Sequence, residues 1–446
     1  MGTLDKVKGL VENPPKEYRS APFWGWNDRL QKENLGEQIE GFKKAGMGGF
    51  FIHSREGLET EYLSTEWMED VKFCVDKARE NDLELWIYDE DKWPSGAAGG
   101  KVSRVNPAEF TARALTMECG KAGELAVPAK LSNEEERTVT GNSDSIMCGR
   151  NRSTDENFMS GRNGSEDLAV EETMETEFLQ GVYVIQTAAD GRFIKRMKEY
   201  LTYEEAAGAC GVDEEILLLR QEISGKSEWY NGLMPPDNLN PESVKTFLKL
   251  THEHYEEVFG GSFPKEVKGF FTDEPNCCDF FSVFHEGRPW IPWSIGFTEY
   301  FIEKRGYDPQ EKLPYLFFDG EGAEKIRHDY WKTVAQRFEE SYMKQVYEWC
   351  DKRGLRTTGH ILYENDLGYQ TRVCGAAMPQ LRYLHNPGID LLGAQTDEYL
   401  TVKQCASVAH QYDRSMTISE AYGCTGWELD FSTQKWLGDW QFALGI

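Results

Sequence analysis

Basic residues are scarce in this sequence. Its 446 residues include 49 Lys and Arg against 76 Asp and Glu, which gives a formal net charge of −27. Nucleic acids and anionic membrane surfaces are bound by clustered Lys and Arg side chains, so this balance argues against both kinds of partner. A neutral small molecule is the partner that the composition favours.

Long apolar runs are also missing. The first 20 residues, MGTLDKVKGLVENPPKEYRS, carry several charges and lack the apolar centre of a signal peptide, and no apolar stretch of about 18 residues occurs anywhere. We therefore expect a soluble, cytoplasmic chain without a membrane span.

The ten cysteines show no metal-binding or disulfide pattern. They are scattered without CxxC spacing, and Cys277 and Cys278 are the one adjacent pair. Free thiols are the expectation, because neither a zinc site nor a disulfide framework is indicated.

What the sequence does have is a repeated alternation of apolar runs and helical stretches. Seven runs end in polar, charged or aromatic residues, and they cover 21–27, 48–55, 83–91, 267–272, 355–364, 388–395 and 416–423. This alternation predicts a (β/α)8 barrel of the TIM type, whose chemistry lies at the C-terminal ends of the strands. An eighth strand should begin where the sequence stops, so we expect a barrel truncated before that strand and further domains in a longer chain.

The rhythm breaks after the third predicted strand. Polar residues fill about 133–177, and β-like runs separated by turn signals follow them. The length also exceeds the ~250 residues of a typical barrel. We therefore predict a first barrel part at 1–105, a β-rich insertion at 106–226 and a second barrel part at 227–446.

Two glutamates occupy the predicted strand ends where a glycosidase keeps its acid and base. Glu274 follows the fourth strand in TDEPN, and Glu420 ends the seventh in ISEAYG. Paired carboxylates across a barrel mouth can protonate a leaving oxygen and activate water. The alternatives are a helix N-cap or loop ion pair for Glu274 and a rim hydrogen bond for Glu420. Asp273 should point to the opposite face and position other groups.

Other polar and aromatic residues end the same strands. They are candidates for binding sugar hydroxyls or stacking on sugar rings, against the alternatives of solvated loops and ordinary core positions. These candidates are Trp24, Trp26, His53, Asp89, Asp91, Trp93, Asp273, His360, Glu364, Gln395 and Trp427. The acids at 89–91 could also bind a hard cation such as calcium, although no EF-hand spacing accompanies them.

Four segments carry a resemblance to a known family. YRSAPFWGWNDRL, GMGGFFIHSREGLETEYLS, LWIYDEDKWPSGAAGG and GFFTDEP resemble the barrel of the α-L-rhamnosidase-like proteins of glycoside hydrolase family 106. The resemblance implies a (β/α)8 catalytic barrel, hydrolysis of terminal α-L-rhamnosides with inversion, and a bound calcium ion. It places Glu274 in the site as a carboxylate.

Three functions follow from these observations. The first is a glycoside hydrolase that uses Glu274 and Glu420. The second is a non-catalytic or decayed sugar-binding barrel within a larger protein. The third, a metal-dependent amidohydrolase, ranks last because WGWND lacks the His-x-His pair that such enzymes carry after the first strand.

Overall fold

The computed structural model describes residues 3–125, 177–278 and 287–446. Its described residues fall into two compact units. Unit 1 draws on Met1–Phe110, Lys226–Phe280 and Val334–Ile446, and unit 2 on Thr111–Gly225 and Phe281–Thr333. The structure is therefore described one unit at a time.

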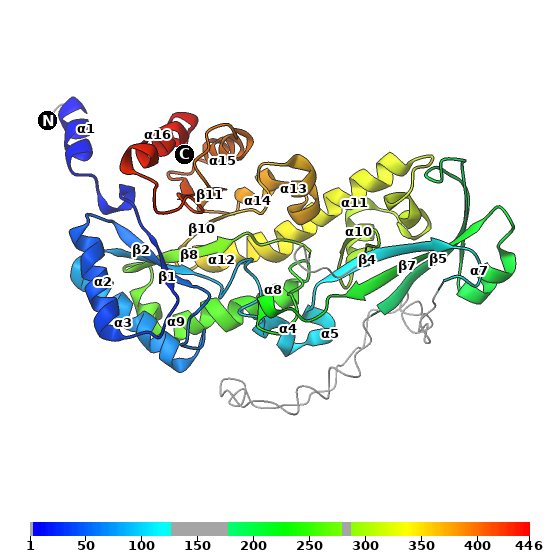
Figure 1. Ribbon diagram of the computed structural model, residues 1–446, viewed down its shortest axis with the longest axis horizontal. Helices are drawn as coiled ribbons and strands as arrows, with labels where there is room; N and C mark the ends of the chain where they lie inside the picture. Colours follow the sequence, from blue (N-terminus) through cyan, green and yellow to red (C-terminus); the bar gives the residue numbers. More distant parts are fainter. Residues whose placement is uncertain (1–2, 126–176, 279–286) are drawn as a thin grey trace. The chain divides into compact units, whose positions relative to one another are not determined.

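Unit 1 contains a sheet of seven parallel strands in the order β1-β2-β3-β8-β10-β11-β12 (Figure 1). Their bounds are β1 Phe23–Trp26, β2 Gly49–Ser54, β3 Glu84–Tyr88, β8 Val267–Asp273, β10 Arg356–His360, β11 Asn386–Leu391 and β12 Ile418–Ala421. Each strand lies within or overlaps one of the seven predicted runs, which confirms the alternation read from the sequence. The short apolar runs suit strands that are covered on both faces.

Helices follow the strands as a parallel sheet requires. The helices of unit 1 are α1 Thr3–Glu12, α2 Lys32–Lys44, α3 Thr65–Asn81, α4 Lys101–Val105, α5 Pro107–Phe110, α8 Pro241–Leu248, α9 His254–Phe259, α12 Lys344–Asp351, α13 Leu367–Cys374, α14 Ala377–Leu381, α15 Leu400–Gln411 and α16 Phe431–Leu444. Helix α3 contacts β3, α12 contacts β10 and α15 contacts β11. Ser64 caps α3 by accepting the Trp67 N–H at 3.2 Å with its side-chain hydroxyl.

The sheet of unit 1 is curled. Phe51, Trp86, Tyr88 and Phe271 form a buried cluster, and side chains from both ends of the strand order, Phe23 of β1 and Ile418 of β12, pack against it. Strands at opposite ends of the order can meet in one cluster only when the sheet bends round on itself. The described residues form a curled half-barrel of seven strands, so closure by an eighth strand stays a prediction.

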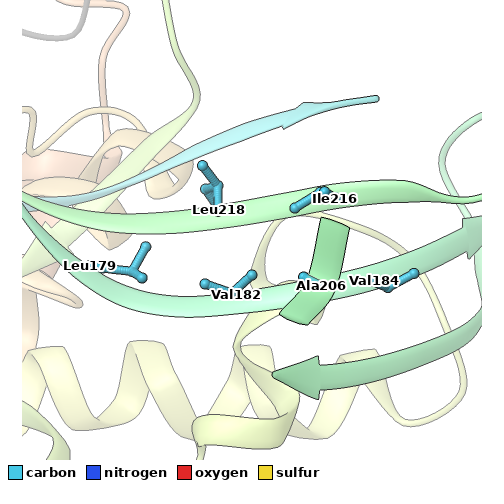
Figure 2. Close-up of a cluster of buried hydrophobic side chains, with 6 residues drawn as sticks. All are labelled: Leu179, Val182, Val184, Ala206, Ile216 and Leu218. Carbon is cyan, nitrogen blue, oxygen red and sulfur yellow. The ribbon is translucent and has the colours of Figure 1, made fainter. Parts of the chain in front are cut away.

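Unit 2 is built on an antiparallel sheet with the order β6-β5-β7-β4-β9. Its elements are β4 Arg113–Gly120, β5 Glu177–Thr187, β6 Ile194–Tyr200, α7 Tyr203–Ala209, β7 Glu215–Ile223, β9 Trp290–Trp293 and α10 Phe297–Arg305. Helix α11, Ala323–Phe338, includes residues of both units. Figure 2 shows the apolar cluster formed by Leu179, Val182, Val184, Ala206, Ile216 and Leu218 from β5, β7 and α7.

The two units differ from the predicted domains mainly in one segment, while the boundaries of the predicted insertion at 106–226 shift by a few residues. Residues 287–333, which the sequence assigns to the second barrel part, belong to unit 2 because β9 pairs antiparallel with β4. Residues 106–115, at the start of the predicted insertion, divide between α5 and the start of β4. The polar segment between Asn133 and Glu177 lies outside the described residues except for its final residue.

None of the helices in the described ranges is long and apolar enough to cross a lipid bilayer.

Candidate active site

Acidic side chains converge at the C-terminal ends of four neighbouring strands of unit 1. Because the strands are parallel, their C-terminal ends share one edge of the sheet. We call the group formed there the acid cluster, and its members are Asp273, Glu274, His360, Glu364, Asp390 and Glu420. All are buried or half-buried.

His360 is the centre of the acid cluster. Its Nε2 lies 3.1 Å from Asp273 Oδ1 and 2.9 Å from Glu420 Oε2. The strand register explains the first contact, since His360 on β10 lies opposite Asp273 on β8. The residue before it must be glycine: a Cβ on Gly359 would lie 1.9 Å from the Thr272 carbonyl oxygen, and its φ is +139°.

The charges around His360 favour its protonated form. Burial lowers the pKa of the imidazole, but the Asp273 carboxylate, the hydrogen bond and charge of Glu420, and Asp390 together raise this pKa well above its ordinary value. An imidazolium donates charge-assisted hydrogen bonds to its carboxylate neighbours. His360 is thus the cation of the acid cluster.

Glu274 follows β8 in a conformation that is unusual for a glutamate. Its φ of +47° lies in the left-handed region, and Pro275 comes next. Non-glycine residues held there gather at functional sites because the surrounding structure must impose the conformation. Burial raises the pKa of Glu274 to about 8, against the opposing effect of His360. Its carboxyl group therefore keeps its proton at neutral pH.

Asp273 is held from two sides. Its side chain accepts a hydrogen bond from the Tyr88 hydroxyl, and its backbone N–H donates to Ser95 Oγ at 2.8 Å. The expectation that Asp273 points away from Glu274 is wrong, because both carboxylates lie near a ring nitrogen of His360. Strand alternation stops at Asp273, where β8 ends, and the left-handed turn at Glu274 brings the next side chain back. Burial raises the pKa of Asp273 to about 6, with His360 opposing.

Glu364 and Asp390 complete the acid cluster. Glu364 Oε2 accepts the backbone N–H of Asp390 at 3.0 Å. Burial raises the pKa of Glu364 to about 8 and that of Asp390 to about 7, each opposed by His360. Five carboxyl groups around one cation cannot all be ionised in a buried site, so the acid cluster holds protons at neutral pH.

Asp89, Glu90 and Asp91, which follow β3, lie outside the acid cluster and hold the loop after that strand through hydrogen bonds. Glu90 accepts backbone N–H groups from Asp91 and from Gly96, Ala97, Ala98 and Gly99 at 2.6–3.1 Å. Asp89 accepts the Ser95 hydroxyl at 2.6 Å. These bonds fix the loop after β3, and Ser95 in that loop ties it to Asp273. Asp89 is fully buried, and Ser95 links it to Asp273.

The residues that could hold a metal ion do not match calcium. Among the residues that the structure describes, two groups have ligand atoms within 4.8 Å of one another, Asp273–His360–Glu420 and Glu274–His360–Asp390. Both depend on the imidazole of His360, whereas calcium takes 6–8 oxygen ligands. Glu90 is saturated by backbone N–H groups and gives no alternative. The implied calcium ion thus does not fit these donors, and a nitrogen-and-oxygen set suits a transition metal better.

His53 reaches the acid cluster through Tyr88. Its ring stacks on that of Tyr88, with the ring centroids 3.7 Å apart. The Tyr88 hydroxyl in turn donates a hydrogen bond to the Asp273 carboxylate. Burial, and then the charge of Arg55, lower the pKa of His53 to about 3, so it stays neutral.

The tryptophans of β1 are buried and pack against helices. Trp24 contacts Phe42 of α2, and Trp26 contacts Trp67 of α3. They are 7% and 2% exposed, which leaves no open ring face for a sugar. The reason is strand alternation: Phe23 faces the inner cluster, so residues 24 and 26 face outward.

The remaining predicted residues lie elsewhere along the strand ends. Trp93 packs against Trp229, with ring centroids 5.0 Å apart. Gln395 is exposed and donates to the Leu392 carbonyl, and Trp427 is fully exposed. Asp91 lines a cavity described below. In the described part of the chain, Asp91, Gln395 and Trp427 form no hydrogen bond or ion pair with the acid cluster.

Two residues of the site were not predicted from the sequence. Asp390 lies within the apolar run GIDLL, and Tyr88 ends LWIY. An acid inside an otherwise apolar strand is itself a signal, because a buried carboxylate needs a partner. Tyr88 carries no such signal, since tyrosine is common in strands.

No family model matches the chain. A "Putative beta-glucuronidase" of Formosa agariphila is 20% identical over 459 residues, covering 99% of this chain and 37% of that protein. The structure of a rhamnosidase from Novosphingobium sp. PP1Y superposes with a TM-score of 0.61 at 14% identity, covering 99% of this chain and 55% of that one. The chain thus spans 37% of the length of the first relative and 55% of the length of the second. At 14% identity, the structural likeness shows a shared fold alone.

Proposed function

We propose that this chain carries the catalytic barrel of a glycoside hydrolase that acts on terminal α-L-rhamnosides. One observation carries the proposal: two carboxyl groups in contrasting environments, those of Glu274 and Glu420, both lie near His360 at the C-terminal edge of the strands. Glu274 is kept protonated by burial, and Glu420 accepts a hydrogen bond from an imidazolium. Such a pair is what acid and base roles require.

In this mechanism Glu274 donates its proton to the leaving glycosidic oxygen. Glu420 accepts a proton from the attacking water, and His360 orients Glu420 through the bond between Nε2 and Oε2. Asp273 shares that ring nitrogen and fixes the orientation of the imidazole. The reaction would invert the anomeric centre, with no step that passes through a metal ion.

The comparisons support a glycosidase of this fold but leave the sugar open, because their names point to a rhamnoside and to a glucuronide. The four family-106 segments of the sequence favour the rhamnoside. The substrate is thus an oligosaccharide or glycoside.

The test is a panel of aryl glycosides, including the α-L-rhamnoside and the β-D-glucuronide, offered to the complete gene product. On the members of the panel whose leaving group needs a proton to depart, Glu274→Gln and Glu420→Gln should each lower turnover on the order of 10² to 10⁴-fold. Glu257→Gln, a change at an exposed position, should leave turnover unchanged. NMR of the first anomer released reports inversion. A folded protein that binds saccharides without turning any over would instead favour the sugar-binding module.

A further inference from the structure

A cavity of about 370 Å³ lies beside the C-terminal ends of β2 and β3. Its volume falls within the range of about 300–1,000 Å³ common for small-molecule sites. The residues that matter for its chemistry are Arg55, Asp91, Lys92, Lys101, Arg104 and Asn231. All of them belong to unit 1.

Basic side chains outnumber acidic ones in the cavity, although the chain carries a net charge of −27. Four basic side chains line it beside three acidic ones, Glu56, Glu61 and Asp91. Lys101 Nζ lies 3.3 Å from Glu61 Oε1. Within the described ranges, Arg55 and Lys92 form no ion pair. Lys92 Nζ reaches only a neutral group, the amide oxygen of Asn231, at 3.3 Å.

The carboxylates of the cavity do not neutralise those two cations. Asp91 accepts the Ser54 hydroxyl at 2.7 Å and the Asn231 amide at 2.9 Å, so both of its oxygens shape the wall. Glu61 is engaged with Lys101, and Glu56 forms no ion pair with Arg55 or Lys92 in the described structure. Two positive charges therefore face the cavity without a carboxylate partner.

The cavity lies along the same sheet edge as the acid cluster. Arg55 comes directly after β2, and β2 and β3 precede β8 in the order of the sheet. The charge of Arg55 also lowers the pKa of Asp273, so its field reaches the acid cluster. A ligand held by Arg55 would thus bind at the sheet edge that also carries the proposed chemistry.

We propose that this cavity binds an anionic group of the substrate, a carboxylate or a sulfate ester on a sugar residue, with Arg55 and Lys92 as its cationic partners. A guanidinium pairs with either oxyanion in a two-point geometry, and the ammonium of Lys92 adds a point charge. The proposal rests on the proposed function and narrows its substrate to an acidic oligosaccharide, in contrast to the neutral partner that the overall composition favours.

The experiment uses calorimetric binding of oligosaccharides from rhamnose- and uronate-containing polysaccharides to the complete gene product carrying Glu274→Gln, which prevents turnover. The same fragments are offered untreated, after reduction of their carboxylates to alcohols, and after removal of sulfate. Untreated fragments should bind about 10- to 100-fold more tightly than fragments without the anionic group, because the treatment removes a hydrogen bond between charged groups. The treatment that abolishes the difference identifies the anion.

Arg55→Met and Lys92→Met should each bind the untreated fragments about 10- to 100-fold more weakly than the parent does. Their affinity for the neutral fragments should change little. Lys352→Met removes one exposed charge elsewhere in unit 1 and should bind like the parent. Equal binding of charged and neutral fragments, or Arg55→Met behaving like Lys352→Met, would overturn the proposal while leaving glycoside hydrolysis intact. Preferential binding of acidic fragments without turnover by the unsubstituted protein would instead reject the hydrolase and keep the anion site.

Discussion

Buried charge is handled in opposite ways by the two units of this protein. In the antiparallel sheet of unit 2, Arg220 lies 2.9 Å from Glu118 and 3.3 Å from Glu177, and Arg288 lies 2.9 Å from Glu222. In the acid cluster of unit 1, five carboxyl groups share the single imidazole of His360. The contrast shows that burial of a charged group is not by itself a sign of function. An excess of one sign, with raised pKa values, is the better sign.

The largest expected effect is on the free energy of unfolding, and it distinguishes the acid cluster of unit 1 from the ion pairs of unit 2. His360→Gln leaves Asp273 and Glu420 without their cation, which should lower the free energy of unfolding by about 3–5 kcal/mol. Arg220→Met should cost only about 1–2 kcal/mol, because the side chains of Glu118 and Glu177 are 32% and 39% exposed and water can solvate them. Calorimetric unfolding at pH 7 measures both.

A compensated variant controls for lost packing. Asp273→Asn combined with His360→Gln removes one negative and one positive charge together, so part of the lost stability should return. Equal losses in His360→Gln and Arg220→Met, with no recovery in the double variant, would contradict the account of unit 1 as an uncompensated cluster.

Activity should depend on pH through Glu274. The carboxyl group must hold its proton to act as an acid, and its pKa is about 8, so kcat/KM should fall about tenfold per unit as the pH rises above that region. The decrease of kcat/KM at high pH reports an apparent pKa of the coupled acid cluster as a whole and not of one residue. Glu274→Gln should lack this basic limb. A rate that still rises between pH 8 and 9 would argue against this role.

Stability should depend on pH through Glu364. Its pKa rises from an ordinary value of 4.5 to about 8, so its contribution is complete below pH 4.5 and is lost as the pH rises through 8. Glu364→Gln cannot ionise and should be more stable than the parent by on the order of a few kcal/mol at pH 9, with little difference at pH 4. Calorimetry at both values checks this, with Glu257→Gln as the unaffected control.

Calcium should have the smallest effect. Because the donors of both candidate metal groups include His360, removal of calcium by EGTA should shift the unfolding temperature by less than about 1 °C. A rise of several degrees on adding calcium would show that an oxygen-rich site exists apart from these two groups.

Much of the fold and part of the site follow from the sequence alone. The seven strands were predictable because each is a short apolar run followed by a helical pattern. Glu274, His360, Glu364 and Glu420 were predictable because each lies at or just past such a run, and parallel strands bring their ends together.

The features that could not be predicted depend on local backbone conformation, on strand register or on pairing between distant segments. The left-handed turn at Glu274 overrides the alternation that placed Asp273 on the other face. Trp24 and Trp26 were expected to bind sugar, yet the register of β1 turns both toward helices. The pairing of β9 with β4, which moves residues 287–333 into unit 2, joins segments separated by about 170 residues, and no local pattern encodes it.

The most direct measurement compares two leaving groups in two variants. An acid is needed for a poor leaving group such as a sugar or methanol, and hardly at all for 2,4-dinitrophenolate, which departs without a proton. The account predicts that Glu274→Gln hydrolyses the dinitrophenyl glycoside within about tenfold of the parent rate but loses on the order of 10² to 10⁴-fold on the sugar glycoside. Glu420→Gln should lose both. Equal losses of Glu274→Gln on the two substrates would contradict the assignment of Glu274 as the acid.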